Sequence, residues 1–347
     1  MDIGSPAIAA YFSYVYHLIS STVQSDLMAG IISLVVAFVV FLIILSVMFS
    51  IFSYIFGWIE RKMIARAHSR HGPTYVGKYG FLQNLADVLK LISKEHIVPH
   101  NADTPLFQTI LPLIVAVFMT LLVFIPFTGS FVGINTDLGL LAVFIALSFT
   151  PLLLFLAGWT SGNKFGSISA QRSVVILISY EIPLILVVAA IAMMAGSFSL
   201  TSIVNAQQSG WYGLLMPIGL VVFFIVLLAE LERPPFDLRE ADNELIAGWL
   251  TDVSAPYYGL SLLLDYTRVF VGTLLISVLF LGGWLGPAII PQFAWLMIKV
   301  VILSLLIIVI RATFVRMRID RVLRTGWLYL TPLAVVNLLI TFLLFIK

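Results

Sequence analysis

Cysteine is absent from this 347-residue chain, and charged residues are scarce. Without cysteine the chain forms no disulfide, ligates no iron–sulfur cluster through thiolates and has no thiol nucleophile. Asp, Glu, Lys and Arg make up 10% of the residues, against about 25% in a soluble domain. Hydrophobic residues make up 61%, and the mean hydropathy is +1.09. This composition excludes a single soluble core and indicates a polytopic membrane protein.

Motifs of self-contained enzymes are also missing. The sequence has no Walker loop, no dinucleotide-binding glycine fingerprint and no histidine pair at metal-ligand spacing. Four of the five histidines, His68, His71, His96 and His100, share one segment, where we expect loop or partner contacts. No basic region precedes the first apolar run, so a cleaved signal peptide is not expected. The two halves show no repeat, which disfavours an inverted-repeat transporter.

Eight apolar runs are long enough to cross a bilayer core of about 30 Å. We therefore predict an all-α fold, a polytopic membrane helix bundle of about eight transmembrane helices in one membrane domain (residues 1–347). The predicted spans lie near residues 27–56, 106–127, 138–160, 173–195, 213–232, 257–281, 290–312 and 327–346. Residues 1–25 form a polar and aromatic leader, expected to be a short interfacial or re-entrant piece.

Lysine and arginine lie on one side of the predicted bundle. Sixteen of the 19 basic residues lie in or directly beside the segments 57–104, 159–172, 233–256 and 313–326, whereas the alternate connections hold none. The positive-inside rule makes these four segments cytoplasmic loops of a cell-membrane protein, with both termini outside. The first loop contains an amphipathic helix, with Phe81, Leu85, Val88, Leu89 and Ile92 on one face. Such a helix lies on the membrane surface or beneath a docked partner.

An acidic stretch separates two of the spans. Eight of the 17 acidic residues lie between Glu230 and Asp265, most of them within residues 229–244. Charge against lipid is costly, so this stretch faces water, a partner protein or a polar cavity. Crowded carboxylates raise one another's pKa, which suits proton relay. A solvated loop at the headgroup layer is the alternative.

Further charges lie inside predicted spans. A carboxylate at the position of Glu181 costs roughly 2.5–3.5 kcal/mol in a bilayer, so we expect it to be buried, either as a packing residue or on an ion path. Asp265 and Arg268 share one span. We expect each to have a partner elsewhere, and Asp265 to face Glu181 or the acidic stretch. The basic residues from 311 to 324 fit anionic lipid heads, the acidic stretch or a docked partner.

Nine short motifs occur in one order along the chain. They are Glu60-Arg61-Lys62, the series from Gly72-Pro73 to Lys90, Lys94-Glu95, Gly158-Trp159, Asn163-Lys164-Phe165, Ser179-Tyr180-Glu181, the series from Pro235-Phe236-Asp237-Leu238 to Gly248, Gly282-Gly283-Trp284 and Ile310-Arg311-Ala312. In content and order they resemble the H subunit of respiratory complex I, from about residue 57 to the C-terminus. The resemblance implies an eight-span fold with the orientation predicted above.

The resemblance also implies roles for individual residues. It implies a chamber for a lipid quinone around Arg61, Arg70, Asp87, Phe236 and Arg311. It implies an acidic passage, the E-channel of this family, through Glu181, Glu230, Glu240, Asp242, Glu244 and Asp265, and we add Glu232 and Asp237 to the predicted proton path. The sequence departs from the family at two kinds of position. Asp242 and Asp265 stand where Glu is commoner, and Glu232 adds a negative charge where many relatives are neutral.

By this resemblance the chain is a subunit of a multi-subunit oxidoreductase and binds no cofactor itself. Electrons reach a lipid-soluble quinone or methanophenazine from iron–sulfur clusters in peripheral quinone-site partner subunits. Proton translocation involves small membrane subunits and antiporter-like subunits. Membrane lipids are expected partners, and nucleic acid is not. The alternatives are the corresponding subunit of a membrane-bound hydrogenase and a stand-alone proton-coupled transporter. The isoleucine-rich, cysteine-free sequence suggests an archaeal relative, such as a reduced-deazaflavin dehydrogenase.

Overall fold

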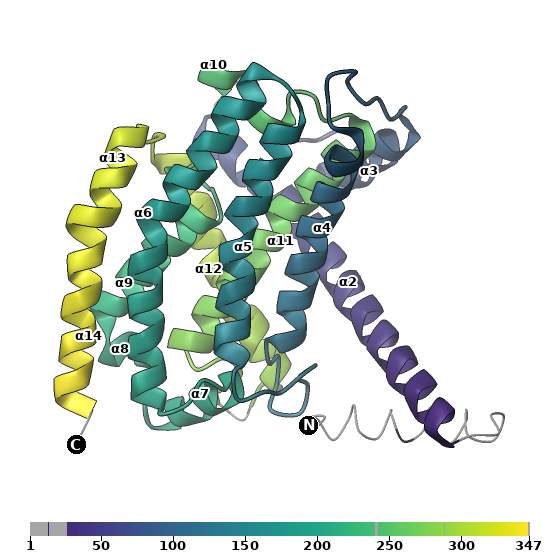
Figure 1. Cartoon of the computed structure of the whole chain (residues 1–347). Helices are drawn as coiled ribbons and strands as arrows, with labels where there is room; N and C mark the ends of the chain where they lie inside the picture. The colour runs from purple at the N-terminus through teal and green to yellow at the C-terminus, as the bar shows by residue number, and fades with distance from the viewer. Residues whose placement is uncertain (1–12, 14–25, 240–241, 288, 346–347) are drawn as a thin grey trace.

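The computed structural model describes residues 26–239, 242–287 and 289–345, together with Ser13 (Figure 1). Its regular elements are all helical over these residues, which confirms the predicted all-α membrane bundle. The long helices are α2 (Asp26–Ala67), α4 (Thr104–Phe124), α5 (Gly139–Thr160), α6 (Lys164–Ala195), α11 (Ala255–Phe280) and α12 (Gln292–Thr313). A further one combines α13 (Ile319–Arg324), a π-helical turn (Thr325–Leu330) and α14 (Thr331–Phe345). Short helices are α3 (Gln83–Ser93), α7 (Leu200–Ala206), α8 (Tyr212–Leu215), α9 (Pro217–Glu230) and α10 (Asp242–Leu245).

Seven helices of the described residues are long and apolar enough to cross a membrane. The segment predicted as an eighth span, 213–232, is instead broken into α8 and α9 at Met216 (φ −130°, ψ 70°). The break has a local cause, because Pro217 lacks a backbone N–H and disfavours helical geometry in the residue before it. At about 1.5 Å per residue, the 14 residues of α9 reach only ~21 Å.

Two helices extend past their predicted cytoplasmic ends. Helix α2 continues to Ala67, so Glu60, Arg61 and Lys62 lie on a helix rather than in a loop. It ends where Ser69 adopts φ 57° and Arg70 N–H donates back to the Ala65 carbonyl at 2.7 Å. Helix α6 begins at Lys164, capped by the Asn163 side chain. In both helices the sequence becomes polar before the cytoplasmic end of the helix is reached. The apolar runs therefore indicate where the bilayer ends rather than where the helix ends.

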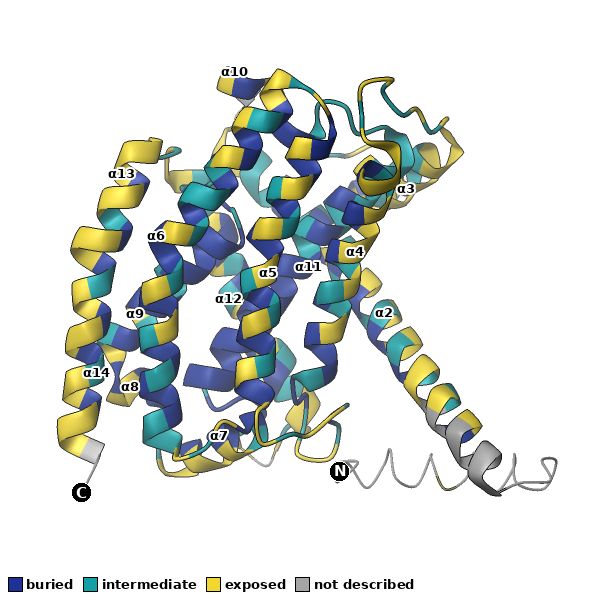
Figure 2. Ribbon diagram, in the orientation of Figure 1, coloured by how far each residue is buried: buried dark blue, intermediate teal, exposed yellow. Residues whose placement is uncertain are grey.

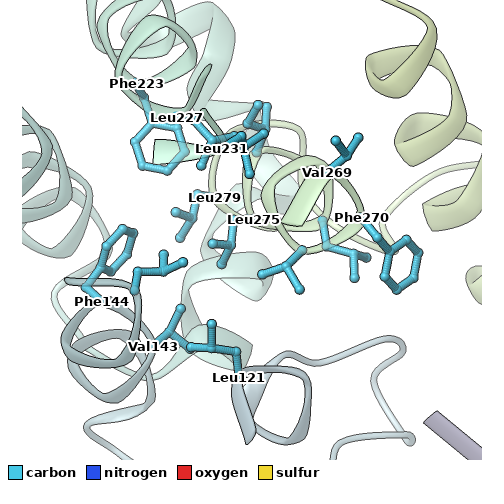
Figure 3. Close-up of a cluster of buried hydrophobic side chains, with 14 of the residues drawn as sticks. Leu121, Val143, Phe144, Phe223, Leu227, Leu231, Val269, Phe270, Leu275 and Leu279 are labelled. Carbon is cyan, nitrogen blue, oxygen red and sulfur yellow. The ribbon is translucent and has the colours of Figure 1, made fainter. Parts of the chain in front are cut away.

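The bundle is organised around α11 and α6. Helix α11 packs against α2, α4, α9 and α12, and α6 packs against α5, α9 and α14. Of the residues in the apolar stretch of α11, 78% are buried, whereas in that of α2 only 22% are buried. Figure 2 shows this contrast, with exposed residues along α2 and along α13 and α14. The core between α4, α5, α9 and α11 is aliphatic and aromatic, including Leu121, Phe144, Phe223 and Leu275 (Figure 3).

The start of the acidic stretch lies inside the bundle rather than at its end. The ring of Phe236 lies 5.3 Å from that of Tyr180, centroid to centroid, near the middle of α6. Phe236, Leu238 and Arg239 are buried. The chain then runs along α6 toward the first turns of that helix, where Ser169 Oγ donates to the Arg239 carbonyl at 3.0 Å. The first part of the predicted loop 233–256 is therefore a buried segment.

Helix α3 is the predicted amphipathic helix, and it lies across α2 and α11 at the end of the bundle (Figure 1). Its apolar side chains Leu85, Val88, Leu89 and Ile92 are exposed in the isolated chain. A tight turn precedes it, in which Gly80 has φ +71° and a Cβ there would overlap the Pro73 carbonyl group. Only glycine fits at that position, so residues 72–80 fold compactly beside α2.

Candidate functional site

A cavity of about 440 Å³ lies between α2, α3 and α11, and we name it the apolar cavity. Most of its lining is hydrophobic, including Val88, Leu91, Ile92 and Leu263. Its polar side chains are Ser50, Ser53, Tyr54, Arg61, Asn84, Asp87 and Tyr266. A mostly apolar cavity with a few polar groups is typical of a site for a lipophilic ligand.

A second cavity of about 470 Å³, the polar cavity, adjoins the first. Its lining includes Glu60, Arg70, His71, Pro73 and Arg311. Arg61, Leu262 and Tyr266 line both cavities. The two cavities therefore share a wall that includes Arg61 and Tyr266, with an apolar region between helices on one side and a region rich in arginine on the other.

Polar contacts fix α3 against α2. Arg61 Nη1 donates to Asp87 Oδ2 at 2.6 Å, Gln83 Nε2 donates to Asp87 Oδ1 at 2.9 Å, and Asn84 Nδ2 donates to the Tyr54 carbonyl at 2.9 Å. Burial by itself raises the pKa of Asp87, but the hydrogen bonds from Arg61 and Gln83 outweigh it and leave the pKa below the ordinary value of 3.8. Asp87 is thus an anion at neutral pH, and it closes one wall of the apolar cavity.

Glu60 is a buried carboxylate between two arginines. It accepts hydrogen bonds from Arg233 Nη1 at 3.2 Å and from Arg311 Nη1 at 2.5 Å. Arg233 Nη2 also donates to the Asp265 carbonyl at 3.3 Å, and its guanidinium lies over the Tyr266 ring. These contacts join the polar cavity to the acidic stretch through one side chain, that of Arg233.

Glu232 is the centre of a second ion cluster. Its carboxylate contacts Arg239 and Arg268, the latter at 2.6 Å. Arg268 therefore has a partner other than Asp265, as we predicted. Deeper in the bundle, Ser148 on α5 donates a hydrogen bond to Glu181 on α6, and α6 packs against α9, which ends at Glu230. Glu181, Glu230 and Glu232 thus lie in one region between α5, α6, α9 and α11.

The remaining predicted residues lie apart from these clusters. Asp237 pairs with Arg316 at 2.8 Å, and Glu244, which is exposed, pairs with Arg172 at 2.6 Å. Phe236 packs against Tyr180 instead of lining either cavity. Asp265 is half-buried on α11. Glu240 lies outside the described residues, and Asp242 is described only as the first residue of α10.

Known proteins match this chain over most of its length. The family model described as NADH dehydrogenase matches residues 23–342. The H subunit of the NADH-quinone oxidoreductase of Dehalococcoides mccartyi (strain CBDB1) is 40% identical over 285 residues, 82% of this chain and 80% of the relative. The protein of the same name from Bacillus thuringiensis (strain Al Hakam) is 41% identical over 290 residues, 81% of this chain and 86% of the relative. The corresponding protein of Carboxydothermus hydrogenoformans is 38% identical over 287 residues, 82% of each chain.

The chain belongs to the H-subunit family of NADH-quinone oxidoreductases. The family assignment confirms the resemblance inferred from the motifs, and with it the assignment to a multi-subunit, membrane-embedded oxidoreductase. Four of the five residues predicted for the chamber, Arg61, Arg70, Asp87 and Arg311, line the two cavities of this H-subunit-family protein.

Sequence reasoning missed several residues of the ion clusters. Glu60 was a matched motif residue, but its role as the acceptor for two arginines required knowledge of the α2 and α12 packing. Arg233 and Arg239 lie among the carboxylates of the acidic stretch. The prediction considered only the carboxylates there and assigned no role to these two arginines. Tyr266 had one available signal, since it is a polar aromatic next to Asp265 in a span. Among the described residues, no three His, Asp or Glu side chains are grouped to hold a metal ion.

Proposed function

We propose that this H-subunit-family chain binds a lipid quinone in the two adjoining cavities and couples its reduction to proton translocation. The observation that carries the proposal is that Arg61 and Tyr266 line both cavities, one mostly apolar and the other rich in arginine. The apolar cavity suits an isoprenoid tail, and the polar cavity suits a headgroup that becomes charged on reduction. The finer choice of acceptor, a quinone rather than methanophenazine, follows the names of the relatives.

Reduction of a quinone to a quinol takes two electrons and two protons and forms two O–H bonds. The electrons come from iron–sulfur clusters of peripheral partner subunits, since this chain has no cysteine to ligate one. Negative charge that develops on the quinone oxygens is stabilised by the guanidinium groups around the polar cavity, those of Arg61, Arg70 and Arg311. Partner subunits would cover this end of the bundle, where α3 and the 72–80 turn lie.

Coupling to protons begins at Glu60 and Arg233. Charge that appears in the polar cavity competes with Glu60 for the arginines, and Arg233 transmits the change to the α11 backbone at Asp265. The proposed passage then includes Glu230, Glu181 and Asp265 in the bundle. The other carboxylates predicted for it lie in the acidic stretch, and their individual tasks differ: Glu232, Asp237, Glu240, Asp242 and Glu244. From Glu181 protons would pass to small membrane subunits and antiporter-like subunits. The basic loops face the cytoplasm in this proposal, and both termini face the outside.

Mass spectrometry of the intact complex with its bound lipids tests the chamber. We expect iron–sulfur and antiporter-like partners together with a co-purifying quinone, and reduced occupancy when Arg61 is replaced by Leu. A bound phenazine would keep the chamber but change the acceptor. A nickel–iron partner without a lipid acceptor would instead assign the chain to a membrane-bound hydrogenase. Purification of an active chain without partner subunits would instead support a stand-alone proton-coupled transporter.

Replacing Glu181 with Gln tests the passage. The substitution removes a titratable proton while keeping the acceptor for Ser148. We expect proton translocation per electron pair in membrane vesicles to fall several-fold while the complex assembles normally. The matched control is Asp320→Asn, which neutralises an exposed carboxylate on α13. Unchanged translocation in the Glu181 variant would remove Glu181 from the path.

A further inference from the structure

Two buried arginines share one carboxylate at the junction of α9, α11 and the acidic stretch. Arg239 and Arg268 both contact Glu232, and the exposed fractions of the three side chains are 2%, 1% and 7%. Arginine stays protonated in proteins. A carboxylate between two guanidinium groups is strongly favoured in its charged form. Glu232 is therefore held as an anion, although its position in the acidic stretch suggested a proton carrier.

Glu230, two residues earlier, has the opposite surroundings. It is buried at the end of α9, and its Oε1 atom has no hydrogen-bond partner among the described residues. The charged groups that act on it are Glu181 from α6, Arg268 from α11 and Arg239 from the acidic stretch. Burial and Glu181 favour its neutral form, whereas the two arginines favour its ionised form. Opposed influences of this kind leave a carboxyl able to change its protonation state.

The net charge of the cluster decides the balance. With Glu232 ionised, Arg239, Arg268 and Glu232 together carry one positive charge. That surplus charge attracts an ionised Glu230 and vanishes if one arginine is neutralised. It doubles if Glu232 is neutralised. The two changes therefore act on the protonation of Glu230 in opposite directions, although both disrupt the same ion pairs.

We infer that Glu232 is a fixed counter-ion and not a proton carrier, and that Arg268 and Arg239 enable Glu230 to release its proton toward Glu181. In that step one O–H bond breaks at Glu230 and one forms at Glu181, directly or through an intervening water. Arg268 is a positioning residue, because it acts through Glu230. The inference rests on the proposed passage and assigns different tasks to carboxylates that the sequence grouped together.

The test compares five variants of the intact complex in inverted membrane vesicles: Arg268→Gln, Arg268→Lys, Glu232→Gln, the double variant Glu232→Gln/Arg268→Gln, and Glu230→Gln. The readout is the pH dependence of protons translocated per electron pair. We expect Arg268→Gln to move the half-maximal pH upward by about one unit, the size that one nearby charge produces, and Glu232→Gln to move it downward. Arg268→Lys and the double variant keep the net charge of the cluster, so both should stay close to the original profile. Glu230→Gln should abolish translocation at every pH.

Opposite shifts distinguish an electrostatic role from structural damage, which would move both single variants alike. Equal shifts, or no shift with Glu230→Gln inactive, overturn the inference and leave the proposed passage intact. Normal translocation in Glu230→Gln and Glu181→Gln overturns the passage and the inference together. If either single variant fails to assemble, the double variant decides: coupling near the original level supports the inference, and its loss overturns it.

Discussion

The carboxylate of Glu60 on α2 accepts a 2.5 Å hydrogen bond from Arg311 on α12, although the two residues are 251 positions apart. With Arg233 as a second donor, Glu60 joins the first helix, the acidic stretch and the seventh predicted span. The contact closes one side of the polar cavity and is the most distant in sequence of the site's ion pairs.

Glu60→Gln should reduce both stability and turnover. Two guanidinium groups would then face a neutral amide, and breaking a buried ion pair by removing one partner costs about 3–5 kcal/mol. We expect at least tenfold lower quinone reductase activity and a lower unfolding temperature of the complex. Glu60→Asp keeps the charge and should retain more of both. Activity within twofold of the unsubstituted complex for Glu60→Gln would contradict a role for this triad.

Gly259→Phe should obstruct the apolar cavity. A Cβ at Gly259 would lie 3.6 Å from Leu91, so a larger side chain has room at its root and projects toward the space between α11 and α3. We expect the KM for a long-tailed quinone to rise about tenfold, because the new ring occupies the space of the tail. The kcat for a short-tailed quinone should change little, because its headgroup site is not affected. Gly210→Phe, which introduces the same ring where nothing lies within 4 Å, is the matched control. An equal effect on both quinones would argue against a tail site.

Asp87→Asn should loosen α3 at neutral pH. The pKa of Asp87 is lowered in the folded protein, so its ion pair with Arg61 stabilises the fold above the ordinary value of 3.8 and is lost as the pH falls through the lowered value. Hydrogen exchange of α3 should therefore be faster in Asp87→Asn than in the unsubstituted protein at pH 5–8. The difference should shrink and then disappear as the pH falls below 3.8 and through the lowered pKa of Asp87. A difference that persists in acid would show that the amide, not the lost charge, is responsible.

Lys299→Met should destabilise the end of α11. Lys299 Nζ donates to the carbonyls of Leu281, Gly283 and Leu285 at 2.6, 2.8 and 2.9 Å, and it is buried beside the rings of Trp211 and Trp295. Each carbonyl left without a donor in a buried site costs about 1–3 kcal/mol. We expect a lower unfolding temperature than for Arg324→Met, which removes an exposed cation. Equal unfolding temperatures would mean that water replaces the ammonium group.

Hydropathy predicted the bundle well, because each span must be apolar over the bilayer thickness whatever its neighbours are. It did not predict the break at Met216 within an apolar run, although Pro217 was a visible signal. It also missed the helical extension to Ala67, since α2 remains helical after it leaves the apolar zone.

The candidate site was predictable only in part. Arg61 and Asp87 were matched to family positions, and the structure brings them together at 2.6 Å. The pairing of Glu232 with Arg239 and Arg268 depends on tertiary packing of the acidic stretch against α11, which no local pattern encodes. Phe236 was assigned to the chamber, and its packing on Tyr180 shows how deeply the stretch enters the bundle.

That depth has an electrical consequence. Tyr180 lies seven residues into the span predicted from residue 173, which corresponds to roughly 10 Å at about 1.5 Å per residue, or about one third of a 30 Å core. In the proposed passage, a proton that moves between the cytoplasm and Glu181, the neighbour of Tyr180, would therefore cross part of the transmembrane field. A full crossing costs or yields about 2.3 kcal/mol per 100 mV, so this step would contribute about 0.7 kcal/mol per 100 mV. In this proposal an energised membrane would bias the proton occupancy of Glu181 directly, so that the membrane potential acts on the proton path itself.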